Sequence, residues 1–257
     1  MKDLPSWWRS PKTQKILIVA GFVGLWEVTA FVLNTRFLPE PFQVGKTLVE
    51  LSITGELFVH SLVSLTRVVA GFFLALLIGI PLGIVMGWSP RMENFSVILE
   101  LIRPIPPLAW IPLALIWFGI GFESKVFIIF IGAFFPILSN SFLGVRETEP
   151  YLIEAGKVLG ATDSEVLRKI VIPNSFPSIL EGLRIGLGIA WMCLVAAELT
   201  GLKNPLGLGY LIMEARDLGR TDIVIAGMIA IGVIGYIMNF ALRRAEGNLV
   251  RWKGDQT

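Results

Sequence analysis

Long apolar stretches alternate with short polar connections along this chain. Six of the stretches hold about 20 mainly apolar residues, the length that a helix needs to cross the hydrocarbon core of a bilayer. They cover approximately residues 16–33, 62–88, 97–118, 126–145, 183–202 and 223–242. The pattern predicts an all-α membrane protein of about six transmembrane helices. Its transmembrane domain covers residues 16–242, between short polar ends at 1–15 and 243–257.

The composition agrees with this prediction and excludes several classes of protein. Of the 257 residues, 54% are hydrophobic and 16% are charged, whereas about a quarter are charged in an average soluble domain. This composition excludes a disordered protein, and the single cysteine, Cys193, excludes a disulfide scaffold. A net charge of +2 gives no sign of a nucleic-acid-binding protein.

The basic residues indicate how the helices are oriented. Thirteen lysines and arginines lie in the two termini, the second-to-third connection and the fourth-to-fifth connection (146–182), and six lie in the other connections. Cytoplasmic connections are enriched in lysine and arginine, so both termini are expected in the cytoplasm. The first span is long, contains Glu27 and is followed by no small-residue cleavage site. We therefore expect a retained membrane helix and not a signal peptide.

The fourth-to-fifth connection is the longest one predicted on the cytoplasmic side. A short helix begins near Pro150, and Gly160 is well placed to end it in a left-handed cap. Thr162 and Glu165 form a capping box that opens a second short helix, which Pro173 is expected to end. Together the two helices predict a compact knuckle with apolar residues exposed in the cytosol, which calls for a partner protein.

The same connection resembles the signature of the inner-membrane permease subunits of bacterial ABC importers. That signature reads E-A-A-x-x-x-G, then nine residues, then I-x-L-P. Two positions of this chain depart from it conservatively, Gly156 and Ile172. The resemblance implies a type I ABC importer permease fold, in which the knuckle is a coupling helix seated in a groove of an ATPase subunit. The coupling residues would be Glu154, Ala155, Gly156, Gly160, Ala161, Ile170 and Pro173.

The resemblance also implies partners and a mechanism. Two permease copies, expected to be a homodimer, would work in the bacterial inner membrane with two cytoplasmic ATP-binding cassette ATPases and an extracytoplasmic solute-binding protein. ATP-driven closure of the ATPases would move the knuckle and switch the helix bundle between two packed states, which gives alternating access. The loop over residues 203–222 and the outer segment before the second span would face the binding protein.

A second stretch narrows the class of solute. The segment from Arg103 to Gly121 reads RPIPPLAWIPLALIWFGIG and resembles the corresponding segment of permeases for nitrate, sulfonates and taurine. The resemblance implies a small, anionic solute. Because the binding protein would supply most of the selectivity, the resemblance does not name the solute.

Prolines near the start of the third span predict irregular backbone there. Lipid does not tolerate unsatisfied backbone groups, so this segment is expected to line a pathway, with a kinked packing helix as the alternative. The candidate pathway residues are Arg103, Pro107, Trp110, Pro112 and Glu198. Glu198, near the outer end of the fifth span, suits a structural ion pair or a gate better than direct contact with an anion. Arg67 lies near a span end and is expected to extend to the interface.

Nothing in the chain predicts catalysis, a cofactor or a metal site. His60 is the only histidine and is expected at the surface, at the mouth of the second span. Gly45-Lys46-Thr47 resembles the end of a Walker A loop, but Glu40 stands where that loop needs a glycine, so ATP hydrolysis is expected on separate subunits. The alternatives are a secondary transporter driven by an ion gradient and an intramembrane enzyme. Central acidic residues, which the first would need, are sparse and no inverted repeat is evident, and the second lacks paired catalytic groups.

Overall fold

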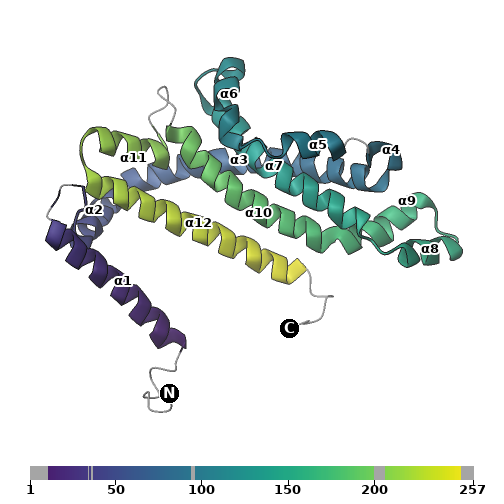
Figure 1. Cartoon of the computed structure of the whole chain (residues 1–257), viewed down its shortest axis with the longest axis horizontal. Coiled ribbons are helices and arrows are strands. Elements are labelled where there is room, and N and C mark those ends of the chain that lie inside the picture. The colour runs from purple at the N-terminus through teal and green to yellow at the C-terminus, as the bar shows by residue number, and fades with distance from the viewer. Residues whose placement is uncertain (1–10, 34, 36, 94–95, 200–205, 250–257) are drawn as a thin grey trace, which may run out of the picture.

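The described part of the chain consists of helices joined by short loops and contains no strand. The structure, a computed structural model, describes residues 11–33, 35, 37–93, 96–199 and 206–249 (Figure 1). Within them, five helices are long and apolar enough to cross a membrane. These are α1 (Pro11–Leu33), α3 (Glu56–Trp88), α7 (Phe122–Arg146), α10 (Ile172–Leu199) and α12 (Thr221–Leu249). The all-α membrane fold predicted from the hydrophobic pattern is confirmed.

The third predicted span is not one continuous helix. It is divided into α5 (Ser96–Ile102), the 3₁₀ helix η2 (Pro107–Trp110) and α6 (Ile111–Phe118). Pro104 and Pro106 cause the break, because proline lacks a backbone N–H and disfavours helical geometry in the residue before it. The irregular start that the prolines predict is therefore confirmed. With eight residues, α6 is about 12 Å long, too short to cross a bilayer alone.

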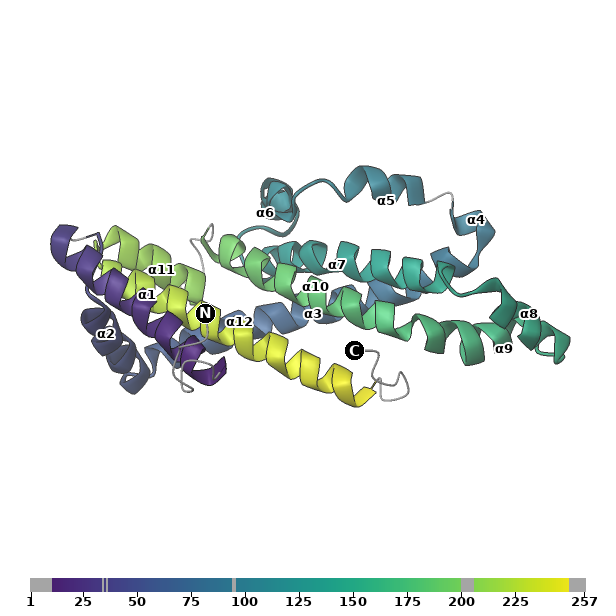
Figure 2. The ribbon, with the colours of Figure 1, turned by 60° about the horizontal axis from the view of Figure 1, so that its bottom comes forward.

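Helices α3, α7 and α10 lie side by side along the middle of the molecule (Figures 1 and 2). Glycines allow their backbones to touch. A Cβ at Gly83 of α3 would lie 2.6 Å from Ser141 Cβ of α7, and one at Gly182 of α10 would lie 2.7 Å from Asn140 Cβ. Close approach of this kind stabilises helix pairs in lipid, where burial of apolar surface alone gives no preference for helix over lipid.

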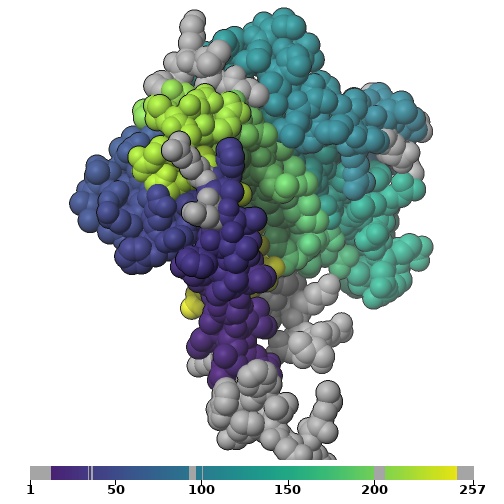
Figure 3. Space-filling model, turned by 60° about the vertical axis from the view of Figure 1, so that its left-hand side comes forward, coloured from purple at the N-terminus to yellow at the C-terminus, as the bar shows by residue number. Residues whose placement is uncertain are grey.

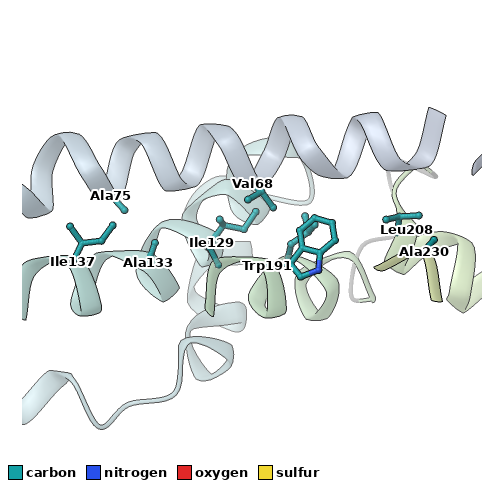
Figure 4. Close-up of a cluster of buried hydrophobic side chains, with 10 residues drawn as sticks. Val68, Ala75, Ile129, Ala133, Ile137, Trp191, Leu208 and Ala230 are labelled. Carbon is teal, nitrogen blue, oxygen red and sulfur yellow. The ribbon is translucent and has the colours of Figure 1, made fainter. Parts of the chain in front are cut away.

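A buried apolar cluster joins these three helices to α11 (Leu208–Asp217) and α12 (Figure 4). Its members are Val68, Ala75, Ile129, Ala133, Ile137, Ala190, Trp191, Leu194, Leu208 and Ala230. Trp191 also donates a hydrogen bond from Nε1 to the carbonyl oxygen of Ile231, at 3.1 Å. This bond satisfies the indole N–H inside the bundle and ties α10 to α12.

The short helices gather at the two ends of the long ones. At one end lie α2 (Pro41–Ile53) and α11, and at the other lie α4 (Pro90–Glu93), α8 (Pro150–Val158) and α9 (Asp163–Val166) (Figures 1 and 2). Helix α1 projects from the body of the molecule beside α2 (Figure 3). Trp26 anchors it, donating from Nε1 to the carbonyl oxygen of Pro39 at 3.0 Å and packing against the buried Val44, Leu51 and Ala226.

The fourth-to-fifth connection continues into α10 without a break. Helix α9 leads into a π-helical turn, η3 (Leu167–Val171), and α10 begins at Ile172. The prediction that Pro173 ends a helix is therefore wrong. A proline is tolerated in the first turn of a helix, and the widened π turn before it replaces the regular hydrogen bonding that proline would interrupt. The second helix of the knuckle is thus an extension of α10.

Candidate functional site

Residues 150–171, from α8 to η3, form the knuckle that the sequence predicts. Helix α8 ends where Gly160 takes a φ of +84°, in the left-handed region that favours glycine. Ala161 N–H donates to the carbonyl of Gly156 at 3.0 Å, and Gly160 N–H to that of Lys157 at 2.9 Å. This pair of bonds is the Schellman pattern, so the predicted left-handed cap is confirmed.

The predicted capping box also forms. Thr162 N–H donates to Glu165 Oε2 at 3.0 Å, and Glu165 N–H donates back to Thr162 Oγ1 at 3.4 Å. Lys169 Nζ lies 3.0 Å from Glu165 Oε1, one turn further along. Two local motifs, both made of residues within the knuckle, therefore fix the turn between α8 and α9.

One side of the knuckle is packed firmly against the bundle. Val145 at the end of α7 forms a buried cluster with Val166 and Val171, and Trp88 at the end of α3 packs against it. Gly156 is buried, and a Cβ there would lie 2.6 Å from Ile170 Cδ1. The departure from alanine at this position of the motif therefore lets α8 approach η3 closely. Movement of the knuckle must carry the ends of α3, α7 and α10 with it.

The other side of the knuckle has exposed apolar residues at the turn that ends α8. Val158 is 86% exposed and Leu159 is 88% exposed, next to Gly160. The predicted coupling residues divide between the two sides. Glu154, Ala155, Gly160 and Pro173 are exposed, whereas Gly156 is buried and Ala161 and Ile170 are half-buried against the bundle. The knuckle thus has a rigid inner side and an apolar tip without a partner.

The third predicted span, divided into α5, η2 and α6, is here called the broken segment. A cavity of about 220 Å³ lies between it and the middle of α7 and α10. Arg103 and Pro107, two of the predicted pathway residues, line it together with Asn140. Arg103 is the only charged residue of this lining and makes no ion pair with a described residue. The Asn140 side-chain amide donates to the carbonyl oxygen of Pro136 at 2.8 Å. The other lining residues are Ile105, Ile131, Gly132, Phe135, Pro136, Ile185 and Ile189.

The other predicted pathway residues lie apart from this cavity. Trp110 is half-buried against a buried cluster of Ala114, Ile128, Cys193 and Ala197, and its Nε1 has no hydrogen-bond partner within the described part of the chain. Pro112 is exposed on α6. The structure therefore brings Arg103 and Pro107 together around one space and places Trp110 at a neighbouring apolar contact.

Glu198 forms a buried ion pair, one of the two roles expected for it. Its Oε1 lies 2.5 Å from Nη1 of Arg67, and neither side chain is more than 1% exposed. Ser64 Oγ donates to the same carboxylate at 2.9 Å. The expectation that Arg67 extends to the membrane interface is wrong. Glu198, on a helix that is distant in the sequence, pairs with the Arg67 guanidinium inside the bundle.

The segment from Leu206 to Gly209, which leads into α11, closes over this ion pair. Arg67 Nη1 donates to the carbonyl of Leu206 at 2.8 Å, and Gly209 N–H donates to Glu198 Oε2 at 2.8 Å. Gly207 has a φ of +137°, and a Cβ there would collide with the carboxylate. Only glycine fits this position.

His60 belongs to the same buried cluster. It is 5% exposed, and its Nδ1 lies 2.8 Å from the carbonyl oxygen and 3.0 Å from the amide nitrogen of Gly207. The expected surface position at the mouth of the second span is therefore wrong. The backbone of the 206–209 segment gives the imidazole a buried polar partner, which removes the need to face water.

Two more residues at these cavities, Lys125 and Asn140, were not predicted from the sequence as site residues. Lys125 counted as part of an outer connection, yet it lies in the first turn of α7 and is 4% exposed. Asn140 was taken as part of an apolar span. The helix-starting residues Gly121 and Ser124 could have indicated that α7 begins before Lys125, since the apolar window alone begins at Val126.

Comparison with known proteins gives consistent matches. The family described as "Binding-protein-dependent transport system inner membrane component" matches residues 75–253. A Methanocaldococcus jannaschii protein assigned as an ABC transporter permease is 48% identical, over 93% of this chain and 91% of its own length. The taurine transport system permease protein TauC of Escherichia coli is 37% identical, over 96% of this chain and 94% of its own. A chain of the MetNI methionine ABC transporter, solved in an inward-facing conformation, shares the fold, with a TM-score of 0.66 at 20% identity over 76% of this chain and 96% of its own.

Proposed function

The chain belongs to the family of binding-protein-dependent transport system inner membrane components, and we propose that it forms the route by which an ATP-driven importer moves a small anionic solute across the membrane. The family consists of transport permeases and not of catalytic enzymes, so this chain is the permease of an ABC transporter. We place the ATP hydrolysis on separate ATP-binding cassette subunits.

The knuckle is the observation that carries this proposal. Its exposed tip, with Val158 and Leu159, suits an apolar groove on an ATPase subunit. Its inner side is locked to the ends of α3, α7 and α10 through Val145, Val166 and Val171. When the two ATPases close on ATP, a tip held in such a groove moves as a rigid body and turns the helices to which it is fixed.

The orientation and the partners follow from this assignment. The knuckle end of the molecule faces the cytoplasm together with both termini, in agreement with the distribution of lysine and arginine. The opposite end, with α2 and α11, faces an extracytoplasmic solute-binding protein. Two copies of the chain form the complete permease, as a homodimer, with one ATPase bound to each knuckle.

The solute is proposed to be anionic for two reasons. The relative TauC is a taurine permease, and taurine carries a sulfonate group. In this chain, the described residues that line the 220 Å³ cavity include one charged side chain, Arg103, and no acidic one. We assign this cavity to the translocation pathway, opened to one side of the membrane at a time. A secondary transporter driven by protons would instead need an acid there, and Glu198 is bound to Arg67.

The coupling of ATP hydrolysis to transport is tested by substitutions in the knuckle that leave the transmembrane helices unchanged. Gly160→Asp strains a backbone at φ +84° and displaces the tip, whereas Glu154→Lys reverses an exposed charge on α8. Both variants are expected to insert into the membrane normally and to lose at least about tenfold in solute imported per ATP hydrolysed, if each removes about 1.4 kcal/mol of coupling. The measurement is ATP-dependent uptake by the reconstituted complex, with the ATPase rate recorded in parallel.

Gly219→Asp is the matched control for backbone strain. Gly219 has a φ of +69° at the end of α11, with the same pair of cap hydrogen bonds, at the opposite end of the molecule. This variant is expected to retain its ATPase subunits and their basal hydrolysis. Normal transport by both knuckle variants would refute the coupling role.

A further inference from the structure

Both cavities lie between helices α7 and α10 and the chain that leads from Arg103 through η2 to α6, a region here called the groove. A second cationic site lies nearer the outer end of this groove. A small cavity of about 10 Å³ is lined there by Ser124, Lys125 and Ala197, together with Ala114 of α6. Lys125 is 4% exposed and makes neither an ion pair nor a hydrogen bond to any described residue. Lys125 thus brings a cation to the lining of a cavity inside the bundle, and charged residues placed inside membrane proteins are costly and mark functional groups.

The charges around Lys125 do not balance. The charges of both Arg67 and Glu198 act on the Lys125 ammonium, so two cations share one carboxylate. Glu198 is already saturated by Arg67, Ser64 and the N–H of Gly209. Arg67 also keeps two buried nitrogens, Nε and Nη2, without a hydrogen-bond partner in the described chain. The outer end of the groove therefore carries one positive charge in excess, which attracts an anion.

An apolar contact separates this site from the larger cavity at Arg103. The contact, here called the plug, consists of Trp110 on η2 and Ala114 on α6, packed against Ile128 of α7 and Cys193 and Ala197 of α10. The outer cavity is lined by three residues of the plug, Ala114, Ile128 and Ala197.

The plug also reaches the inner cavity. Cys193 Sγ would lie 2.7 Å from a Cβ at Gly132, which lines the inner cavity. The two cationic sites thus follow each other along one groove, with the plug between them.

We propose that Lys125 and Arg103 are successive binding stations for the anionic group of the transported solute, and that the plug closes the route between them. The proposal rests on the proposed function, because it needs an anionic solute and a pathway along α7 and α10. An outer cavity of about 10 Å³ holds about one water molecule, so the route is closed in this structure. The η2–α6 segment, interrupted by prolines and in contact with α7, is the element that must move to open it (Figure 1).

Cys193 serves as a built-in reporter of this route, because it lies in the plug and is the only cysteine of the chain. The full complex with its ATPases and binding protein is reconstituted in liposomes and treated from the outside with two methanethiosulfonate reagents. One carries a sulfonate and the other a trimethylammonium group of similar size. During ATP turnover we expect Cys193 to react on the order of tenfold faster with the sulfonate reagent. The two reagents carry opposite charges, so an excess cation beside the route attracts one and repels the other.

The variants assign the preference to the two stations. Lys125→Gln is expected to reduce the preference for the sulfonate reagent to nearly one, and Lys125→Arg, which keeps the charge, should restore it. Arg103→Gln should leave labelling from the outside unchanged and lower ATP-dependent import of taurine by on the order of tenfold. Lys15→Gln is the matched control, because Lys15 is an exposed cation on α1, away from the groove and the knuckle. It should retain both the labelling preference and import.

The outcomes separate this proposal from the proposed function. ATP-driven import of taurine that is unaffected by Lys125→Gln and Arg103→Gln would overturn the two stations and leave the importer assignment intact. Absence of labelling at Cys193 during turnover, or equal labelling by both reagents, would overturn the route through the plug. Protection of Cys193 by chloride but by no sulfonate would identify a resident inorganic ion and would also overturn the proposal. If the unmodified complex imports no solute when ATP is supplied, the proposed function itself is contradicted.

Discussion

Replacing Glu198 with alanine is expected to destabilise the permease by about 3–5 kcal/mol, because it leaves the Arg67 guanidinium buried without its partner. Arg67 is fully buried on α3, and its Nη1 lies between the Glu198 carboxylate and the carbonyl of Leu206. The same change removes the acceptor of Gly209 N–H, so the segment that leads into α11 loses its attachment. Equilibrium unfolding of the purified protein in mixed micelles measures the loss.

Two variants define what this result means. Glu50→Ala removes an exposed acid that pairs with Lys46 on α2, and it should cost less than about 1 kcal/mol. The double variant Arg67→Met with Glu198→Leu removes both charges, so it should be more stable than Glu198→Ala alone. A Glu198→Ala protein as stable as the Glu50→Ala control would contradict the structural role of the pair.

Replacing Leu159 with aspartate at the knuckle tip is expected to release the ATPase subunits. Leu159 is 88% exposed in the free chain, and burying a leucine in a partner's apolar groove contributes about 1.5–3 kcal/mol. An aspartate there would lose this contribution and bring a carboxylate into an apolar groove, which costs more. The affinity for the ATPase should therefore fall by about 100-fold or more, as measured by titrating the ATPase onto the detergent-solubilised permease.

Leu218→Asp provides the control for this substitution. Leu218 caps α11 at the opposite end and is 71% exposed, so the variant carries the same chemical change without touching the knuckle. It should bind the ATPase as the unmodified chain does. Unchanged affinity in Leu159→Asp, or an equal loss in both variants, would show that the tip is not the docking surface.

Features set by neighbouring residues could be predicted from the sequence. The long helices follow from apolar stretches of sufficient length, and the knuckle follows from two caps whose members lie within a few residues of each other, such as Thr162 and Glu165. The break in the third span follows from Pro104 and Pro106, although its extent does not. Pro173 misled the prediction, because the π turn before it depends on how the knuckle packs.

Features that join distant segments could not be predicted. Arg67 and Glu198 are 131 residues apart, so their ion pair depends on α3 and α10 packing side by side. His60 and Gly207 are 147 residues apart, which is why the histidine was expected at the surface. Lys125 was assigned to a connection because the apolar stretch begins at Val126, and only the packed bundle shows that Lys125 is buried.

The proposed division of labour between this permease and separate ATPases agrees with the small share of charged residues in the chain, 16%. Its described residues include no cluster of acids, histidines and cysteines that could hold a metal ion. Its apolar tip at Val158 and Leu159 and its cationic cavity at Arg103 are the features that need something from outside the chain. We propose that the first receives movement from the ATPase and the second receives the solute.

The central claim is that this permease takes its energy from ATP hydrolysed on separate subunits. The most direct test is to purify the tagged chain from its native membrane in mild detergent, identify the proteins that remain bound and assay the preparation in liposomes. We expect stoichiometric ATP-binding cassette ATPases and uptake that requires ATP on the knuckle side of the membrane. A chain that purifies alone and takes up solute in response to an ion gradient would contradict it.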